Sequence, residues 1–333
     1  MPEISVVMAV YNGEKYIREA LDSILKQTFT LFEAIIIDDA SVDATPEILS
    51  EYAKKDSRIK VFTNESNQRL AKSLNRGIAL AKGKYILRMD ADDICLKDRF
   101  EKQYEYMESH KDTDVSFCKF FAKKENEIIP CCVGRKCDFE SIKAMFLFFC
   151  PVLHPGVIAK SEVMKKYGYD PEHTCSEDLD LWMRMISDGR KIECEDDYLM
   201  LYRLHSSQIT ANSSRKQKEE VPKSERKYFS AMNISIPDEE FYINGVYFRE
   251  RFDESKMREF RAAVTGGGKI KKSAILNAFT EVLAEHRRGG ERGVLRLAGI
   301  KLAVLGAFKK IRNSKDRKKA QIAAANAGIE ITG

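Results

Sequence analysis

The chain has 333 residues, 44% of them hydrophobic and 32% charged, with a formal net charge of +5. This composition suits one large α/β domain with an extension, or two domains, and excludes a chain that is disordered throughout. No apolar run reaches the roughly 20 residues that a membrane-spanning helix needs.

Short apolar runs alternate with amphipathic stretches over residues 4–118, which predicts repeated βαβ units and a mostly parallel sheet. We expect strands at 4–10, 33–38, 59–62, 84–89 and 114–119, and helices near 13–27, 44–56, 68–82 and 97–110. The run Ala34–Ile37 is continuously apolar, as expected of a parallel strand that is buried on both faces.

The pattern becomes less regular after residue 118. We expect a hairpin over 119–133 with its turn near Glu125 and Asn126, helices at 138–149, 161–167 and 176–189, a loop at 151–156 and a strand at 198–204. Beyond about residue 212 the chain is helical and basic. These changes divide it into segments 1–118, 119–211 and 212–333.

The strongest motif is Asp90-Ala91-Asp92-Asp93, directly after the predicted strand 84–89. Ligands of an open parallel sheet bind beyond the carboxyl ends of its strands. Carboxylates crowded there repel one another unless a cation neutralises them, and hard oxygen ligands suit Mn²⁺ or Mg²⁺. The alternative is an acidic turn, with Asp93 capping the next helix.

Other strand ends carry further candidates. Tyr11 follows the first strand, where its ring could face a base, and Asn12 could cap the next helix. Asp38 or Asp39 could accept a hydrogen bond from a uracil N–H, or be an ordinary loop carboxylate. For Asp43 we favour a helix cap.

Two predicted helix starts carry charged groups. Arg69 could bind phosphate at its helix start, or be a solvated surface arginine. Ser176 could cap the helix that begins with Glu177 and Asp178, and a carboxylate there could deprotonate an acceptor hydroxyl. His205 follows the strand 198–204 and could reach a metal or a diphosphate, although a lone histidine is usually structural.

Taken in their order along the chain, these motifs over residues 3–210 resemble those of glycosyltransferase family 2, of the bacterial glycan-synthesis type. The resemblance rests on Ser5–Asn12, Asp38–Thr45, Asn67–Ile78, Asp90–Asp93, and Glu177-Asp178 with Trp182. It implies the GT-A fold, with a Rossmann-like, mostly parallel sheet. It also implies an inverting hexosyl or N-acetylhexosaminyl transferase that uses a nucleotide-diphosphate sugar, with UDP favoured.

The resemblance also implies roles for single residues. Tyr11 and Asp39 match positions that hold the nucleoside. Position 9 is a further nucleoside position in the family and is often Thr or Pro, but here it is Ala9, so any side-chain contact from that position is absent. Arg69 is a further nucleotide or phosphate contact, and Asp90 faces ribose or metal. Asp92 matches the principal ligand of Mn²⁺ or Mg²⁺, His205 a histidine near the diphosphate, Asp178 the catalytic base, and Glu177 a residue that orients acceptor or base.

The same resemblance makes 1–118 the nucleotide-sugar half and 119–211 the acceptor half of one domain. Four residues of the acceptor half could line a sugar site, although we expect most of them in the core: Phe146, Phe148, Phe149 and His154. The expected acceptor is a saccharide or a lipid-linked glycan, as in polysaccharide or cell-envelope synthesis.

The basic segment 212–333 has two interpretations. The apolar stretch 294–308, followed by cations from Lys309 to Lys319, could lie on the inner face of the cytoplasmic membrane. Alternatively it packs on the enzyme's core or on a second subunit. Nucleic acid is not expected, because aromatic residues do not alternate with these cations.

The eight cysteines are not spaced in the sequence as zinc ligands are. With a strand starting near residue 4 and no predicted signal peptide, we expect free thiols in the cytoplasm.

Two rival functions fit parts of this pattern. A nucleotidylyltransferase would need a glycine-rich loop after the first strand, and only Gly13 is present there. A sugar-nucleotide-binding or membrane scaffold with an inactive site would have no need for a base at Asp178.

Overall fold

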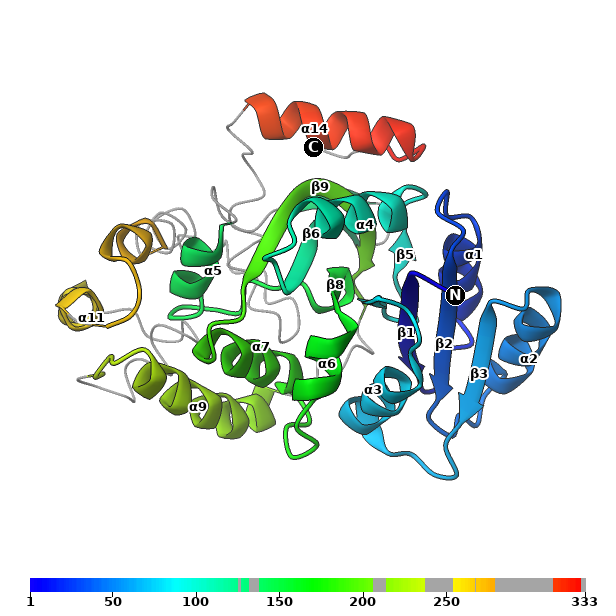
Figure 1. Ribbon diagram of the computed structural model, residues 1–333, viewed down its shortest axis with the longest axis horizontal. Helices are drawn as coiled ribbons and strands as arrows, with labels where there is room; N and C mark the ends of the chain where they lie inside the picture. The colour runs from blue at the N-terminus through cyan, green and yellow to red at the C-terminus, as the bar shows by residue number, and fades with distance from the viewer. Residues whose placement is uncertain are drawn as a thin grey trace.

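The computed structural model describes residues 1–124, 127–131, 138–205, 214–236, 254–266, 268–278 and 314–330 (Figure 1). Its strands are β1 Ile4–Val10, β2 Phe32–Asp38, β3 Ile59–Thr63, β4 Tyr85–Arg88, β5 Ile94–Cys95, β6 Val115–Lys124, β7 Glu127–Cys131, β8 Val157–Lys160 and β9 Ile192–Arg203. Its helices include α1 Ile17–Leu25, α2 Thr45–Lys55, α3 Arg69–Leu80, α4 Arg99–Ser109, α5 Phe139–Met145, α6 Ser161–Tyr167, α7 Glu177–Ser187, α9 Ser214–Ala231, α11 Glu254–Gly266 and α14 Ser314–Asn326.

One mixed sheet runs through the molecule in the order β3-β2-β1-β4-β8-β6-β9-β5, with β7 paired to β6. Strands β1 to β4 pair in parallel, which confirms the predicted α/β class. Strand β8 is antiparallel to both β4 and β6, and β9 is parallel to β6. Strands β1, β2, β4 and β9 therefore point the same way, and their carboxyl ends share one edge of the sheet.

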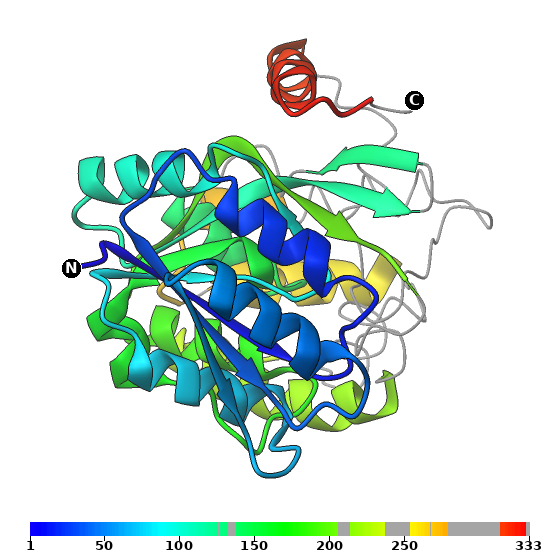
Figure 2. The same cartoon turned by 90° about the vertical axis from the view of Figure 1, so that its right-hand side faces the viewer.

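Helices cover both faces of this sheet (Figure 2). Alternate residues of a strand face opposite sides, so Met8 packs with α1 and α2 whereas Val7 packs with α3. The second face also receives α6 and α7. Phe146 and Phe148 are fully buried in that core, as expected.

Three strands differ from the prediction. Strands β5 and β8 were not predicted, and β9 begins at Ile192 rather than near residue 198. The predicted hairpin is present as the antiparallel pair β6 and β7, while its turn at 125–126 lies outside the described residues. The six cysteines within the described residues are free thiols, as expected.

The C-terminal helices pack on the α/β body. Helix α9 lies beside α7 (Figure 1), and α14 lies along β9 with Ala320 and Ala324 in one apolar cluster with Tyr198 and Leu201. Lys319 of α14 forms an ion pair with Asp196. The stretch 294–308, predicted to contact membrane, core or a second subunit, lies outside the described residues. Across the described parts of the chain, every helix is too short or too polar to span a bilayer.

Candidate active site

The carboxyl ends of β1, β2 and β4 bring the first predicted motifs to one edge of the sheet. Val10 pairs with Asp38, and Val7 pairs with Arg88, so Tyr11, Asp39 and Asp90 each begin a loop at this edge. A Cβ built on Gly13 would lie 4.0 Å from Ala91, which shows that the loop after β1 runs close to the Asp90–Asp93 turn.

Strained backbone is concentrated at the same edge. Three non-glycine residues there have positive φ angles: Asn12 at 53°, Ala40 at 62° and Arg69 at 68°. A left-handed residue other than glycine costs roughly 1–2 kcal/mol, with asparagine penalised less. Such strain persists where surrounding contacts hold it and is frequent at functional sites. Here it marks the loops after β1 and β2 and the start of α3.

Asp39 ties these loops together. Its Oδ1 accepts hydrogen bonds from Asn64 Nδ2 (2.6 Å), the Gln68 amide (2.8 Å) and Ser73 Oγ (2.9 Å). Its Oδ2 accepts one bond, from the Arg69 amide at 2.9 Å. Each oxygen of a carboxylate has about two acceptor positions, so Oδ2, which accepts from one donor, keeps capacity for one more, such as a base N–H.

The three acids after β4 form one cluster. Oxygens of Asp90, Asp92 and Asp93 all lie within 4.8 Å of one another. Asp90 Oδ2 is 2.5 Å from Arg88 Nη1, and Asp92 Oδ2 is 2.8 Å from His205 Nε2. The structure therefore brings the predicted residues Asp90, Asp92 and His205 together, with Asp93 as an additional carboxylate beside them.

Asp93 is the most constrained member of this cluster. It is fully buried, its Oδ1 accepts a hydrogen bond from the Arg203 amide at 2.9 Å, and its Oδ2 has no partner among the described residues. Burial raises the pKa of Asp93 well above its usual value, and the charges of Asp92 and Asp90 raise it further. An orphaned buried oxygen beside two more carboxylates fits a hard divalent cation.

The end of β9 holds this cluster from the other side. Arg203 Nε donates to the Asp92 carbonyl oxygen (2.7 Å), and its Nη2 lies 2.5 Å from Glu19 Oε2. The rings of His205 and Tyr16 lie 4.9 Å apart, so helix α1 also supports this corner. Arg203 was not predicted as a site residue, because nothing in the sequence indicates that β9 returns to the Asp90–Asp93 turn.

Glu177 and Asp178 begin α7 and form the second acidic group. Glu177 is 7% exposed, and burial together with the charge of Asp178 raises its pKa to about 8. Burial also raises the pKa of Asp178, whose Oδ1 accepts a hydrogen bond from the Leu179 amide at 2.8 Å. Its other oxygen, Oδ2, accepts no hydrogen bond from the described residues. That oxygen is therefore free to accept a proton.

Arg88 interacts electrostatically with both acidic groups and was not predicted from the sequence. It is 3% exposed at the end of β4, and its positive charge lowers the pKa values of Asp90, Glu177 and Asp178 against the effect of burial. Its carbonyl oxygen accepts a hydrogen bond from buried Arg99 Nη2 at 3.0 Å, which fixes the strand end. An arginine inside the apolar run Tyr85–Met89 was the available signal.

His154, which we expected in the core, lies under this arginine. It is 8% exposed, and its Nε2 is 2.6 Å from the Tyr169 hydroxyl oxygen. Burial lowers the pKa of His154 well below its usual value, and the charge of Arg88 lowers it further. The imidazole is therefore neutral at pH 7.

Three capping predictions were wrong. Asn12 Oδ1 accepts from the Val42 amide (2.9 Å) rather than from α1. Asp93 bonds to Arg203, and α4 begins after Asp98. Ser176 stands at the N-cap position of α7, but its hydroxyl bonds to His173 and Glu220. Asp43 does accept from the Thr45 amide (3.0 Å) at the start of α2, but the N-cap position is Ala44, one residue later than we favoured.

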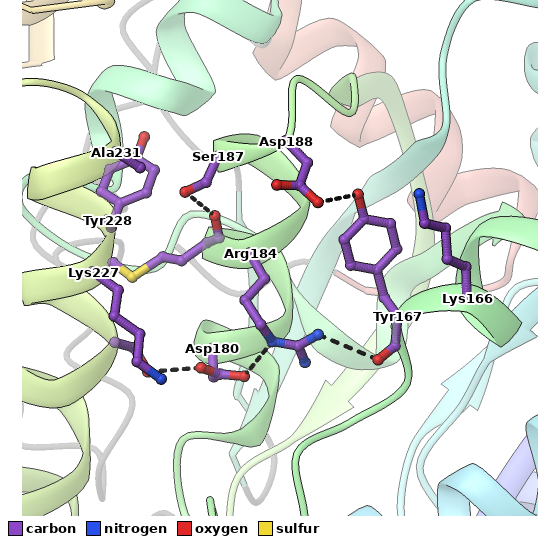
Figure 3. Close-up of a pocket in the computed structure, with 11 residues that line it drawn as sticks. Lys166, Tyr167, Asp180, Arg184, Ser187, Asp188, Lys227, Tyr228 and Ala231 are labelled. Atoms are coloured by element: carbon purple, nitrogen blue, oxygen red, sulfur yellow. Dashed lines mark hydrogen bonds and ion pairs between the residues drawn. The ribbon is translucent and has the colours of Figure 1, made fainter.

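A hollow lies on a different face of α7 (Figure 3). It has a volume of about 450 Å³ and is lined from α6, α7 and α9 by residues that include Tyr167, Arg184 and Lys227. Helical spacing puts its α7 residues, centred near Arg184, on the side opposite Asp178. This hollow is separate from the acids of the candidate site.

Comparisons with known proteins support one family. A family model described as glycosyl transferase family 2 matches residues 5–130. The chain is 35% identical over 254 residues to an uncharacterized glycosyltransferase of Methanocaldococcus jannaschii, and the alignment covers 75% of this chain and 85% of that protein.

Two solved structures show the fold. S. aureus TarS 1–349 in complex with UDP-GlcNAc matches with a TM-score of 0.59 at 20% identity, over 87% of this chain and 92% of that one. The mannosyltransferase PcManGT from Pyrobaculum calidifontis, in complex with GDP-Man and Mn²⁺, matches with a TM-score of 0.54 at 17% identity, over 98% and 86%. The predicted GT-A fold is confirmed.

Proposed function

The chain belongs to glycosyl transferase family 2 and is a glycosyltransferase, and from this premise we propose that it is an inverting enzyme that uses a UDP-sugar. The acceptor is a hydroxyl of a saccharide or of a lipid-linked glycan. The observation that carries the proposal is the presence of two acidic groups, Asp90–Asp93 and Glu177-Asp178, that both interact with the charge of buried Arg88.

In this proposal the first group serves the donor. Asp92, with Asp90, Asp93 and His205 beside it, would hold Mn²⁺ or Mg²⁺. Such a cation offsets negative charge on a departing nucleoside diphosphate. Tyr11, Asp39 and Arg69 hold the nucleoside or its phosphates, and Ala9, at the matching nucleoside position, contributes no side-chain contact. Residues 1–118 then form the donor half, and residues 119–211 the acceptor half.

The second group serves the acceptor. Asp178 takes the proton of the acceptor hydroxyl, whose oxygen forms a bond to the anomeric carbon. The bond from that carbon to the diphosphate oxygen breaks, and UDP leaves with the electron pair. Attack from the face opposite UDP inverts the anomeric configuration. Glu177, which is the more deeply buried of the two and whose pKa is raised to about 8, orients the base or the acceptor.

This mechanism needs no paired acid. In a hydrolase with two carboxyl groups, one protonates the leaving oxygen. Here charge stabilisation replaces that proton. A binding scaffold is the alternative, and it differs from the enzyme by having no use for a base at Asp178.

The test is release of UDP from UDP-GlcNAc, UDP-glucose and UDP-galactose with Mn²⁺, using water as acceptor. Asp178→Asn should lower kcat by about 10²–10⁴, the usual contribution of a general base. Asp188→Asn, at the other end of α7, is the matched control and should keep the wild-type rate. NMR of the freshly released sugar should show the β-anomer.

Equal rates for wild type and Asp178→Asn would contradict the role of the base. Release of the α-anomer would contradict inversion.

A further inference from the structure

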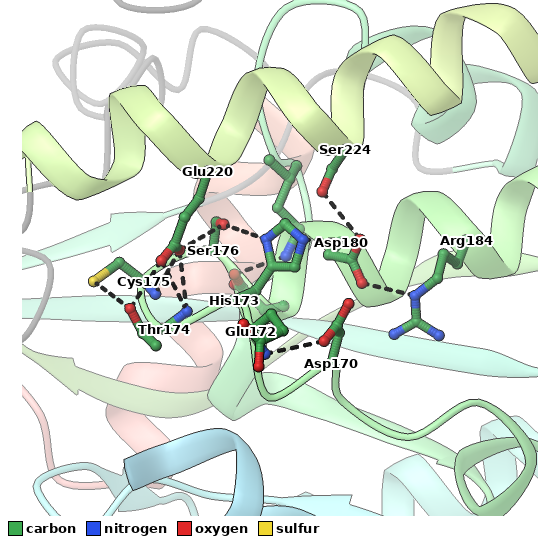
Figure 4. A network of polar contacts seen from close by, with 12 residues as sticks. Asp170, Glu172, His173, Thr174, Cys175, Ser176, Asp180, Arg184, Glu220 and Ser224 are labelled. Atoms are coloured by element: carbon green, nitrogen blue, oxygen red, sulfur yellow. Dashed lines mark hydrogen bonds and ion pairs between the residues drawn. The ribbon is translucent and has the colours of Figure 1, made fainter.

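Helix α9 lies against the segment that leads into the proposed base (Figure 4). Residues 173–176 come directly before Glu177 and Asp178, and they pair with no strand. Their backbone N–H groups need acceptors from elsewhere, because a buried unpaired donor is unfavourable. For the Thr174 and Cys175 amides the acceptor comes from α9, which lies outside the residues that match the family model.

Glu220 of α9 supplies it. Its carboxylate accepts from the Thr174 amide (3.0 Å), the Thr174 hydroxyl (2.8 Å), the Cys175 amide (2.9 Å) and the Ser176 hydroxyl (3.1 Å). The side chain is 7% exposed. Burial alone would raise the pKa of Glu220, but these hydrogen bonds bring it below its usual value. The group is therefore ionised at neutral pH, and charge-assisted bonds of this kind are strong.

Ser224, one helical turn further along α9, makes a second attachment. Its hydroxyl donates to Asp180 Oδ1 at 3.0 Å, and Arg184 Nε donates to Asp180 Oδ2 at 2.7 Å. Residues spaced by four share one face of a helix. One face of α9 therefore holds α7 both before and after Asp178.

This arrangement also explains why Ser176 does not cap α7. Its hydroxyl is used by Glu220 and His173, so the Leu179 amide bonds to Asp178 itself. The orientation of Asp178 thus depends on the first turn of α7, and that turn depends on α9.

We propose that Glu220 is a positioning residue, which holds the start of α7 so that Asp178 faces the acceptor hydroxyl. This rests on the proposed function of Asp178. Metal binding at Asp170, His173 and Asp180 is a weaker explanation of the same network, because both oxygens of Asp180 already have protein partners.

The test compares Glu220→Gln with Glu33→Gln. Glu33 is also a buried carboxylate that accepts side-chain and backbone hydrogen bonds, from Ser5 and Lys82, but it lies on β2. For UDP release from UDP-GlcNAc, Glu220→Gln should lower kcat roughly 10- to 100-fold, since small misplacements of reacting groups have effects of this size. Its KM should stay within about twofold, because the donor contacts remain.

Glu33→Gln should lose thermal stability while keeping kcat. Thr174→Val, which removes one donor and leaves Glu220 in place, should have an intermediate kcat and serves if Glu220→Gln fails to fold. Hydrogen–deuterium exchange over residues 173–179 should be faster in Glu220→Gln than in wild type.

Wild-type kcat in Glu220→Gln, or unchanged exchange at 173–179, would overturn the proposal. A wild-type protein that cleaves none of the three UDP-sugars would contradict the proposed function instead. In that case the exchange rates still decide whether Glu220 holds this segment.

Discussion

At the scale of single residues, the positive charge of Arg88 stabilises the neighbouring carboxylates of the site. A guanidinium remains charged when buried, so it offsets part of the repulsion among Asp90, Glu177 and Asp178. The sequence predicted the acids, because three carboxylates after an apolar strand are unusual. It did not predict Arg88, because an apolar run does not show toward which partners a lone arginine points.

Glu195 provides a test of burial energetics away from the site. It is 2% exposed, its Oε1 accepts from Gln103 Nε2 at 2.6 Å, and burial raises its pKa to about 8. The unfolded chain releases this proton near pH 4.5 whereas the folded chain keeps it to about pH 8, so its contribution to stability falls as pH rises between these values.

We therefore expect Glu195→Gln to gain stability relative to wild type as pH rises from 5 to 8, by on the order of a few kcal/mol. Urea unfolding at pH 5, 6.5 and 8 measures this difference. Glu105→Gln, on the exposed side of α4, is the control. A difference that is constant across these pH values would show that Glu195 titrates normally.

The incorrect caps show a limit of residue-level prediction. Asn12 and Ser176 are good capping residues beside helix starts, but each has a long-range partner, Val42 or Glu220. Local sequence ranks capping tendency and cannot include a partner about 30 or 44 residues away.

At the scale of elements, β9 connects parts of the chain that are far apart. Its end places Arg203 and His205 on Asp92 and Asp93, about 110 residues earlier in the sequence. The sequence predicted only its second half, because Glu193–Asp197 is mainly acidic and does not resemble a buried strand. Glu193 is nevertheless buried, with its carboxylate accepting from Thr113 Oγ1 at 2.5 Å.

Arg203→Met tests whether β9 holds the metal ligands in place. The change keeps an apolar side chain beside Tyr16 but removes the hydrogen bond to the Asp92 carbonyl. Removing such an outer support typically weakens metal binding by about 10–100-fold. We expect this loss in calorimetric titration with Mn²⁺ in the presence of UDP. Arg190→Met, on the loop before β9, should bind as wild type.

The proposed support by β9 would be contradicted if Arg203→Met and Arg190→Met both bound Mn²⁺ as tightly as wild type. The cluster would then be held by Asp90 and Asp92 without β9.

At the scale of the whole molecule, the parallel pairing of β1, β2 and β4 gathers motifs that are dispersed along the sequence. This was predictable, because parallel strands place their carboxyl ends together. The position of β8 was not, since four residues between a loop and a helix give little periodicity. Yet β8 joins the two halves of the sheet by pairing with both β4 and β6.

One face of the basic C-terminal helix α14 packs on this sheet, and the opposite face is exposed. Ala324 is 2% exposed in the cluster with Tyr198 and Leu201, whereas Ile322 is 52% exposed. Ala324→Glu should lower the free energy of unfolding by about 1–3 kcal/mol, because a charge would be buried without a partner. Ile322→Glu, the same change on the outer face, should have little effect in thermal denaturation. Equal losses would mean that α14 does not pack on β9 in solution.

The most direct measurement of the central claim is thermal stabilisation by UDP, GDP, CDP and ADP, with and without Mn²⁺. A ligand that binds only the folded state raises its stability by RT ln(1 + [L]/Kd). We predict that UDP stabilises wild type strongly only with Mn²⁺, and that Asp92→Ala abolishes this while Asp112→Ala, an exposed acid paired with Lys191, does not. Stabilisation by none of the four diphosphates, or equal stabilisation of Asp92→Ala, would contradict a metal-dependent donor site at Asp90–Asp93.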